Sequence, residues 1–226
     1  MNPFGEIDCV TNRILLADDH GMMREGLKML LEHIDETQVV GEADNGRDTV
    51  KLCRELRPDL VIMDVAMPEL NGIEATRQIM TECPGTKVIA LSMHSTKRFI
   101  LDMLQAGAQG YLLKNCAFKE LAEALATVKA GNAYISPSVA SVVVEKLIAP
   151  QAVEDAAAPH ALTPREREVL QLLAEGIRVS EVARKLHVSI KTVQTHRRNL
   201  MAKLNLYSLP ELTKFAIQHG MTSLET

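Results

Sequence analysis

Short apolar runs alternate with longer amphipathic stretches through the first 130 residues. Five of these runs are continuous in apolar residues, which is typical of strands buried on both faces of a parallel sheet. They lie at residues 14–17, 38–43, 59–64, 87–92 and 110–114. The stretches between them repeat apolar residues at spacings of three and four, which indicates covering helices over 22–34, 47–56, 72–82, 96–106 and 118–130. The pattern predicts an α/β fold, a doubly wound (βα)5 parallel sheet.

Beyond residue 131 the pattern becomes purely helical. One helix is predicted from Ser136 and Pro137 to just before Pro150, and the small, acidic segment 151–161 resembles a flexible linker. Four further helices are predicted, the first opened by Thr163 and the others at about 179–186, 190–204 and 208–219. We therefore expect three parts: the sheet domain at 13–130, a linker helix and linker at 131–160, and an all-α four-helix domain at 161–226.

The first helix of the last domain has a complete start signal. Thr163 is placed as the N-cap, Pro164 as the first helical residue and Glu166 as the third, which together form a capping box. By contrast, Arg178 precedes the next helix, where a polar N-cap residue is more usual, so that helix is expected to start without a side-chain cap.

Composition narrows the class of protein. A chain of 226 residues with 46% hydrophobic and 24% charged residues has the size of two domains and enough apolar surface for real cores. No apolar run approaches the roughly 18 residues of a membrane span, and neither a signal peptide nor a transit peptide is readable, so we expect a cytoplasmic protein. The four cysteines show no CxxC spacing, which argues against a disulfide framework or a zinc site.

The charge is distributed unevenly between the two domains. Residues 1–160 hold 15 Lys and Arg against 23 Asp and Glu, whereas residues 161–226 hold 10 against 6. The segment 182–210 contains six basic residues and no acid. Such a segment is either a solvated basic helix or a surface that contacts the phosphate backbone of a nucleic acid. Any nucleic-acid surface is therefore expected in the C-terminal domain.

Candidate chemistry lies at the ends of the predicted strands. Asp18 and Asp19 follow the first strand, Asp64 ends the third, Ser92 ends the fourth and Lys114 ends the fifth. Because the carboxyl ends of parallel strands meet at one edge of such a sheet, these side chains are expected to converge. Crowded carboxylates need a cation, and a few oxygen ligands suit Mg²⁺, which can share a phosphoryl oxygen. Asp64, alone at its strand end, is the predicted nucleophile toward phosphorus.

These residues resemble the receiver domain of two-component systems. The resemblance covers about residues 13–130 and rests on the acidic pair at 18–19, VIMDVAMPELNG at 61–72, ALS at 90–92 and GYLLK at 110–114. It implies that a histidine kinase phosphorylates Asp64 and that Asp18, Asp19, Asp64 and the backbone carbonyl of Ala66 hold Mg²⁺. It further implies that Ser92 and Lys114 engage the phosphoryl group and that Tyr111 is an aromatic switch. His20 and His94, which flank the site, are interpreted as exposed loop residues, since a hard cation is expected.

The helices predicted at 179–186 and 190–204, with a turn between them, indicate a helix-turn-helix whose second helix enters the major groove of DNA. On a helical wheel Val193, Leu200 and Leu204 form a buried stripe, and the polar face lies opposite. The candidate DNA-contacting residues are Gln194, Thr195 and Arg198 for base edges, Lys191 for phosphate, and Arg197, whose stem packs while its head reaches phosphate or water.

The string from Leu162 to Leu206 resembles the LuxR-type helix-turn-helix, and its combination with a receiver resembles the NarL/FixJ family of response regulators. The resemblance implies base contacts at Gln194, Thr195 and Arg198, and pairing of DNA-binding domains through the final helix. An apolar stripe at Leu209, Leu212, Phe215 and Ala216 suits such pairing or simple core packing.

The function expected is a transcription factor and not an enzyme: phosphorylation of Asp64 shifts a two-state receiver, which controls binding of double-stranded promoter DNA. The expected partners are a sensor histidine kinase, promoter DNA and a second copy of the chain, with no membrane.

Two other functions were considered. An Mg²⁺-dependent phosphatase or mutase usually has a second acid two residues after its nucleophile, where this chain has Ala66. An autoinducer sensor needs an aromatic-lined cavity, against which the aromatic content of 3% argues. The kinase, the operator, the sign of regulation and whether the receiver masks the recognition helix stay open.

Overall fold

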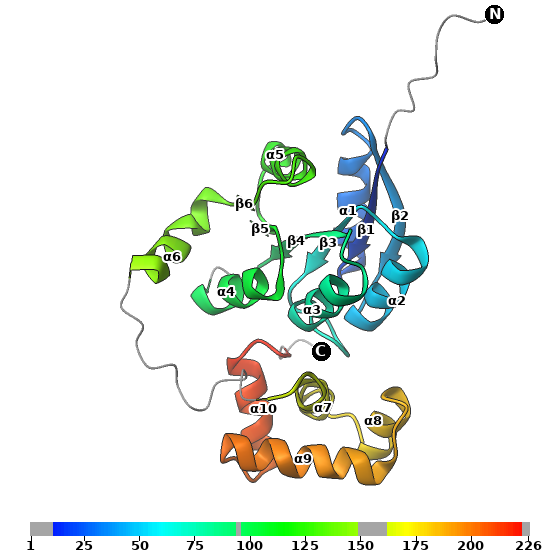
Figure 1. The fold of residues 1–226 in the computed structure, drawn as a ribbon, viewed down its shortest axis with the longest axis vertical. Coiled ribbons are helices and arrows are strands. Elements are labelled where there is room, and N and C mark those ends of the chain that lie inside the picture. Colours follow the sequence, from blue (N-terminus) through cyan, green and yellow to red (C-terminus); the bar gives the residue numbers. More distant parts are fainter. Residues whose placement is uncertain (1–10, 94–95, 149–161, 223–226) are drawn as a thin grey trace, which may run out of the picture.

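The computed structural model describes residues 11–93, 96–148 and 162–222 (Figure 1). His94 and the predicted linker segment 151–161 lie outside the described residues. No helix within the described ranges is long and apolar enough to cross a membrane.

Six parallel strands form one sheet in the order β2-β1-β3-β4-β5-β6. They are β1 (Asn12–Ala17), β2 (Thr37–Ala43), β3 (Leu60–Asp64), β4 (Lys87–Ser92), β5 (Gly110–Leu113) and β6 (Tyr134–Ile135). The five predicted strands and the doubly wound parallel fold are confirmed. The sixth strand was not predicted, because two residues are too few to show a pattern; it pairs with β5 at Gly110 and Tyr111.

Helices cover both faces of the sheet, because successive side chains of a strand point to opposite sides. The helices are α1 (Gly21–Leu31), α2 (Gly46–Leu56), α3 (Gly72–Glu82), α4 (Lys97–Ala106), α5 (Phe118–Lys129) and α6 (Pro137–Ile148). Ile14 and Leu16 of β1 pack with α1 and α5, whereas Leu15 packs with α2 and α3 on the other face. The helix α6, which the sequence analysis assigned to the linker, buries Val139 in this second core beside α4.

The C-terminal domain consists of α7 (Pro164–Ala174), α8 (Val179–Lys185), α9 (Ile190–Leu204) and α10 (Leu209–Gln218), with no strand within residues 162–222. The predicted capping box at Thr163 and Glu166 is confirmed, and Arg178 makes no side-chain cap hydrogen bond at the start of α8. The four helices enclose their own apolar core, which includes the predicted buried stripe of α9.

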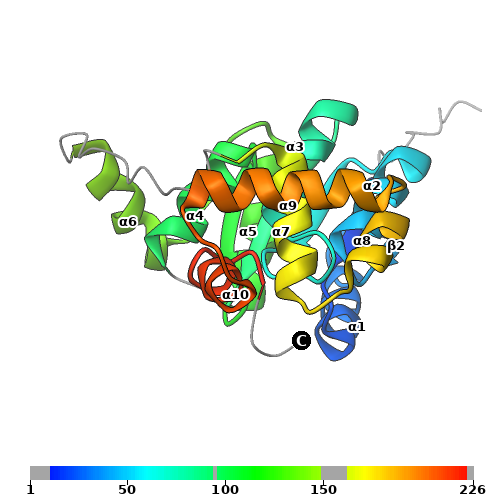
Figure 2. The ribbon, with the colours of Figure 1, turned by 90° about the horizontal axis from the view of Figure 1, so that it is seen from below.

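The two domains are in contact through α7, which lies below α3 and the loop that precedes it (Figure 1). Arg167 of α7 forms an ion pair with Glu74 of α3 at 2.6 Å. The helix α9, the predicted recognition helix, lies on the far side of α7 from the sheet in both Figure 1 and Figure 2. The domains are thus docked, but the first domain does not cover the predicted DNA-reading helix.

Candidate functional site

The carboxyl ends of β1, β3 and β5 form one site at the point where the strand order reverses. Asp18 follows β1, Asp64 is the last residue of β3, and Lys114 directly follows β5. Gly72 opens α3 so close to β3 that a Cβ atom there would lie 2.0 Å from the carbonyl oxygen of Asp64. Only glycine permits this approach of α3 to the end of β3.

Lys114 joins two buried carboxylates. Its Nζ atom lies 2.8 Å from Oδ2 of Asp64 and 2.8 Å from Oδ2 of Asp18, and all three side chains are at most 3% exposed. The second oxygen of Asp64, Oδ1, accepts a hydrogen bond from the backbone N–H of Ala66 at 3.3 Å. Because one ammonium faces two buried carboxylates, the site carries excess negative charge.

The pKa values reflect this imbalance. Burial raises the pKa of Asp64 to about 6, against the opposing effect of Lys114 and with a further contribution from Asp18. Burial acts to lower the pKa of Lys114, but the attraction of Asp64 and Asp18 outweighs it, so that this pKa is raised. The lysine stays charged, and a second cation at the carboxylates would be favourable.

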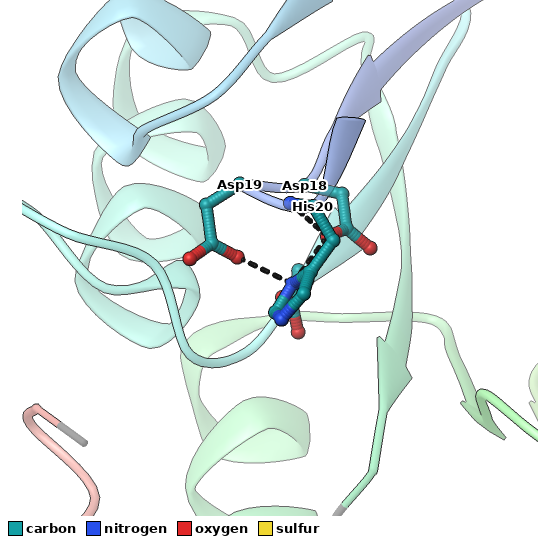
Figure 3. A group of neighbouring side chains, drawn as sticks. Asp18, Asp19 and His20 are labelled. Atoms are coloured by element: carbon teal, nitrogen blue, oxygen red, sulfur yellow. Dashed lines mark hydrogen bonds and ion pairs between the residues drawn. The ribbon is translucent and has the colours of Figure 1, made fainter. Parts of the chain in front are cut away.

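Asp19 and His20 complete an acidic cluster beside these residues (Figure 3). Nδ1 of His20 lies 2.8 Å from Asp19 and 3.1 Å from Asp18, and one ligand atom from each of these residues and from Asp64 falls within 4.8 Å of the others. Oδ2 of Asp18 and Oδ1 of Asp19 are buried and are paired with Lys114 and His20, respectively. This pocket can bind a metal ion, and carboxylate oxygens fit a hard cation such as Mg²⁺.

Ser92 ends β4 beside the acidic site, and Tyr111 is the second residue of the neighbouring strand β5. Tyr111 is fully buried, and burial raises its pKa to about 12, while a hydrogen bond with the Ser92 side chain opposes the rise. The sequence analysis expected this tyrosine to be an aromatic switch. In the structure the ring is already turned inward and bonded to Ser92.

On α9 the predicted division of faces is found. Val193, Leu200 and Leu204 are at most 5% exposed, whereas Lys191, Gln194 and Arg198 are exposed. The predicted contact residues Thr195 and Arg197 are half-buried, and the Thr195 hydroxyl donates to the backbone carbonyl of Lys191 at 3.0 Å, which leaves its methyl group for apolar contact. The basic residues therefore face away from the domain core.

Three of the four residues of the apolar stripe of α10 take the second of the two uses considered above, core packing. Leu212, Phe215 and Ala216 are buried in the core of the C-terminal domain, and only Leu209, which is 40% exposed, reaches the surface.

Several residues at the site were missed by the sequence analysis. His20 is exposed as predicted, but its contacts with both aspartates were not foreseen, although it directly follows the acidic pair. Arg24 donates to the backbone carbonyl of Asp18 and was not singled out. The residues of α7 that contact the first domain, above all Gln171, were also missed; the only signal was a glutamine within the apolar run VLQLL.

Comparison with protein families gives two matches. The response regulator receiver domain matches residues 14–126, and the family described as bacterial regulatory proteins, luxR family, matches residues 160–216.

Known proteins match along nearly the whole chain. Response regulator UvrY of Escherichia coli K12 is 38% identical over 213 residues, which cover 94% of this chain and 97% of UvrY. Response regulator GacA of Pseudomonas aeruginosa is 38% identical over 209 residues, covering 92% and 97%. A solved structure of RcsB from Salmonella enterica serovar Typhimurium, bound to a promoter in the presence of the phosphomimetic BeF₃⁻, is 28% identical with a TM-score of 0.59, covering 94% of this chain and 100% of that one. The chain therefore belongs to the NarL/FixJ family of two-component response regulators, transcription factors that join a receiver domain to a LuxR-type DNA-binding domain.

Proposed function

We propose that a sensor histidine kinase phosphorylates Asp64 and that this phosphorylation controls binding of promoter DNA by α9. In the proposed reaction a carboxylate oxygen of Asp64 forms a bond to the phosphorus of a phosphohistidine. The bond from phosphorus to the histidine nitrogen breaks, and its electron pair returns to the imidazole. Promoter DNA as the target implies that the protein works in the cytoplasm.

The observation that carries the proposal is the contact of Lys114 with both Asp64 and Asp18 in a buried acidic pocket. Lys114 would stabilise the negative charge that develops on the phosphoryl oxygens, and Ser92, beside it, would donate its hydroxyl to one of them. Asp18, Asp19, Asp64 and the carbonyl of Ala66 would hold Mg²⁺. When bound, Mg²⁺ would neutralise charge shared between the carboxylates and the phosphoryl group.

The direct test of the phosphorylation site uses a small phosphodonor. Acetyl phosphate with Mg²⁺ should add one phosphoryl mass to the wild-type protein, as measured by intact mass spectrometry. Asp64→Asn should gain none, and chelation of the metal should abolish the gain in the wild type. Asp59→Asn is a matched control, because Asp59 lies at the opposite end of β3. Equal labelling of Asp64→Asn would assign the phosphoryl group to another residue.

The proposed DNA surface is the exposed basic and polar face of α9. Gln194 and Arg198 would pair with adenine and guanine edges, the Thr195 methyl group would pack on thymine, and Lys191 and Arg197 would contact phosphate. Promoter sites that are read by a helix-turn-helix are commonly occupied by dimers, and one solved relative is described as two RcsB dimers bound to two parallel DNAs. We expect a homodimer on DNA here, with an apolar surface around Leu209, Pro210 and Ile217 of α10 available for pairing.

Two contacts between the domains can transmit the state of Asp64. The first joins α7 to α3 and the loop that follows Asp64. The second places Gly220 against Phe99 of α4, so closely that a Cβ atom on Gly220 would lie 1.7 Å from the ring. Ser92 ends β4, the neighbour of β3, and Tyr111 on β5 packs in the same core as α4. Phosphorylation would change these contacts and thereby the freedom of the C-terminal domain to bind DNA.

A further inference from the structure

The loop between β3 and α3, residues 65–71, directly follows the proposed phosphoacceptor and is held by side chains of the DNA-binding domain. Gln171 of α7 is 1% exposed and lies between the domains. Its Oε1 accepts from the backbone N–H of Asn71 at 2.9 Å and from the Asn71 side chain at 3.0 Å. Its Nε2 donates to the backbone carbonyl of Met67 at 3.0 Å. The Gln171 amide thus joins Met67 to Asn71 across the loop.

The side chain of Glu175, the residue that directly follows α7 as its C-cap, contacts the middle of the same loop. Glu175 accepts from the backbone N–H of Glu69 at 3.1 and 3.3 Å, and Nε2 of Gln171 donates to Glu175 at 2.8 Å. Glu69 has a φ of 65°, a left-handed conformation that is unfavourable for a residue with a Cβ atom. Such a conformation persists where surrounding contacts impose it. Here the backbone N–H of Leu70 donates to the carbonyl of Pro68 at 2.7 Å within the loop, and Glu175 of the C-terminal domain accepts from the backbone N–H of Glu69. Both donors and the acceptor of the Gln171 amide are used in this arrangement.

The restrained loop contains a proposed ligand of the metal. The carbonyl of Ala66 belongs to the peptide that leads into Met67, whose own carbonyl is bonded to Gln171. The backbone N–H of Ala66 is bonded to Asp64. Mg²⁺ demands near-ideal octahedral geometry, so a ligand held in place before binding loses less conformational freedom when the ion arrives. Contacts that fix the loop at residues 67, 69 and 71 should therefore favour binding.

We propose that Gln171 is a positioning residue of the phosphoacceptor site: through the loop 65–71, the docked DNA-binding domain raises the affinity of the receiver for Mg²⁺. This inference rests on the proposed function, because it takes the acidic pocket as the Mg²⁺ site. Since coupling between two equilibria is reciprocal, Mg²⁺ binding strengthens the docking of α7 by the same factor. The DNA-binding domain is then part of the phosphoacceptor site and not only its output.

The test is the Mg²⁺ affinity of the full-length protein, measured by calorimetry for the wild type, Gln171→Ala and Gln171→Glu. Loss of groups that orient metal ligands typically weakens affinity about 10- to 100-fold, and because Gln171 acts through the loop we expect about three- to tenfold weaker binding. Gln171→Glu keeps the size and the acceptor but cannot donate to Met67, and it places a second carboxylate beside Glu175, so at least the same weakening is expected. Gln218→Ala, an exposed glutamine of α10, is the matched control and should bind like the wild type.

A second measurement, hydrogen exchange, reports on the loop itself. Hydrogen exchange at the backbone N–H of Asn71, which donates to Gln171, should accelerate in both variants and not in Gln218→Ala. Unchanged or tighter Mg²⁺ binding in the Gln171 variants, with the exchange at Asn71 accelerated, would overturn this inference alone. A wild-type protein that binds no Mg²⁺ would overturn the proposed function as well.

Discussion

Replacing Asp64 by asparagine should stabilise the protein in the absence of metal. Asp64 is 3% exposed, and burial raises the pKa of its carboxyl from 3.8 to about 6. At about 1.4 kcal/mol for each tenfold change in the ionisation equilibrium, this corresponds to about 3 kcal/mol that the folded state loses when Asp64 ionises. Asparagine removes the charge, keeps the shape and can still accept from Lys114. We therefore expect Asp64→Asn to gain about 1–3 kcal/mol at neutral pH.

The sign of the pH dependence follows from the direction of the pKa change. A carboxyl whose pKa is raised on folding opposes folding fully above the raised pKa and not at all below its ordinary value. The advantage of Asp64→Asn should therefore be complete above about pH 6 and should disappear as the pH falls toward 4. Saturating Mg²⁺ should stabilise the wild type by mass action and leave the variant nearly unchanged, which reduces or reverses the difference.

Differential scanning calorimetry of the full-length proteins measures this effect. For a chain of this size about 2–4 °C in Tm is expected for each kcal/mol. Exposed Asp35 provides the control, because Asp35→Asn removes a charge without relieving burial and should leave the Tm nearly unchanged. A lower Tm for metal-free Asp64→Asn at neutral pH would show that the ion pair with Lys114 outweighs the burial of the charge and would refute this reasoning.

Three further outcomes are expected. Arg198→Ala and Gln194→Ala should each lose about 1–3 kcal/mol of discrimination at particular base pairs, whereas Lys191→Ala should weaken all sequences alike and flatten the salt dependence, as measured by operator titrations at several salt concentrations. Because burial raises the pKa of Glu175 in the docked state, docking should weaken as this carboxyl ionises at rising pH, and the radius of gyration measured by small-angle scattering should increase. Glu175→Gln should remove this pH dependence. A pH profile that is the same in the wild type and the variant would contradict the prediction. Thr163→Ala should cost about 1 kcal/mol in the unfolding of the C-terminal domain by denaturant, since it removes a capping box, and a neutral result would contradict that assignment.

Features with a local sequence signature could be predicted. Asp64 ends a continuous apolar run, so that its place at the carboxyl edge of the sheet follows from the parallel topology alone. The capping box at Thr163 and the buried stripe of α9 are likewise set by neighbours within one or two helical turns. These features depend on periodicity and on local hydrogen bonding, both of which can be inferred from residues close together in the sequence.

Features that depend on residues distant in the sequence could not be predicted. Nothing in the sequence around Gln171 marks it as a contact residue, because its partner Asn71 lies 100 positions earlier and meets it only when the domains dock. The inward position of the Tyr111 ring depends on packing around Ser92, and its side-chain conformation has no sequence signature. Both domains and the acidic pocket are predictable from the sequence. The contact between the domains is not, because it consists of polar groups whose hydrogen-bond partners are set only by the tertiary structure.

The central claim is that phosphorylation of Asp64 controls DNA binding. Its most direct test is a titration of labelled operator DNA with full-length protein at fixed salt, before and after treatment with acetyl phosphate and Mg²⁺, with Asp64→Asn treated in parallel. A coupling of about 1–3 kcal/mol predicts that phosphorylation raises operator affinity about 5- to 150-fold in the wild type and leaves Asp64→Asn unchanged. Equal affinities of the phosphorylated and unphosphorylated wild type would contradict the account, because the receiver would then not regulate DNA binding.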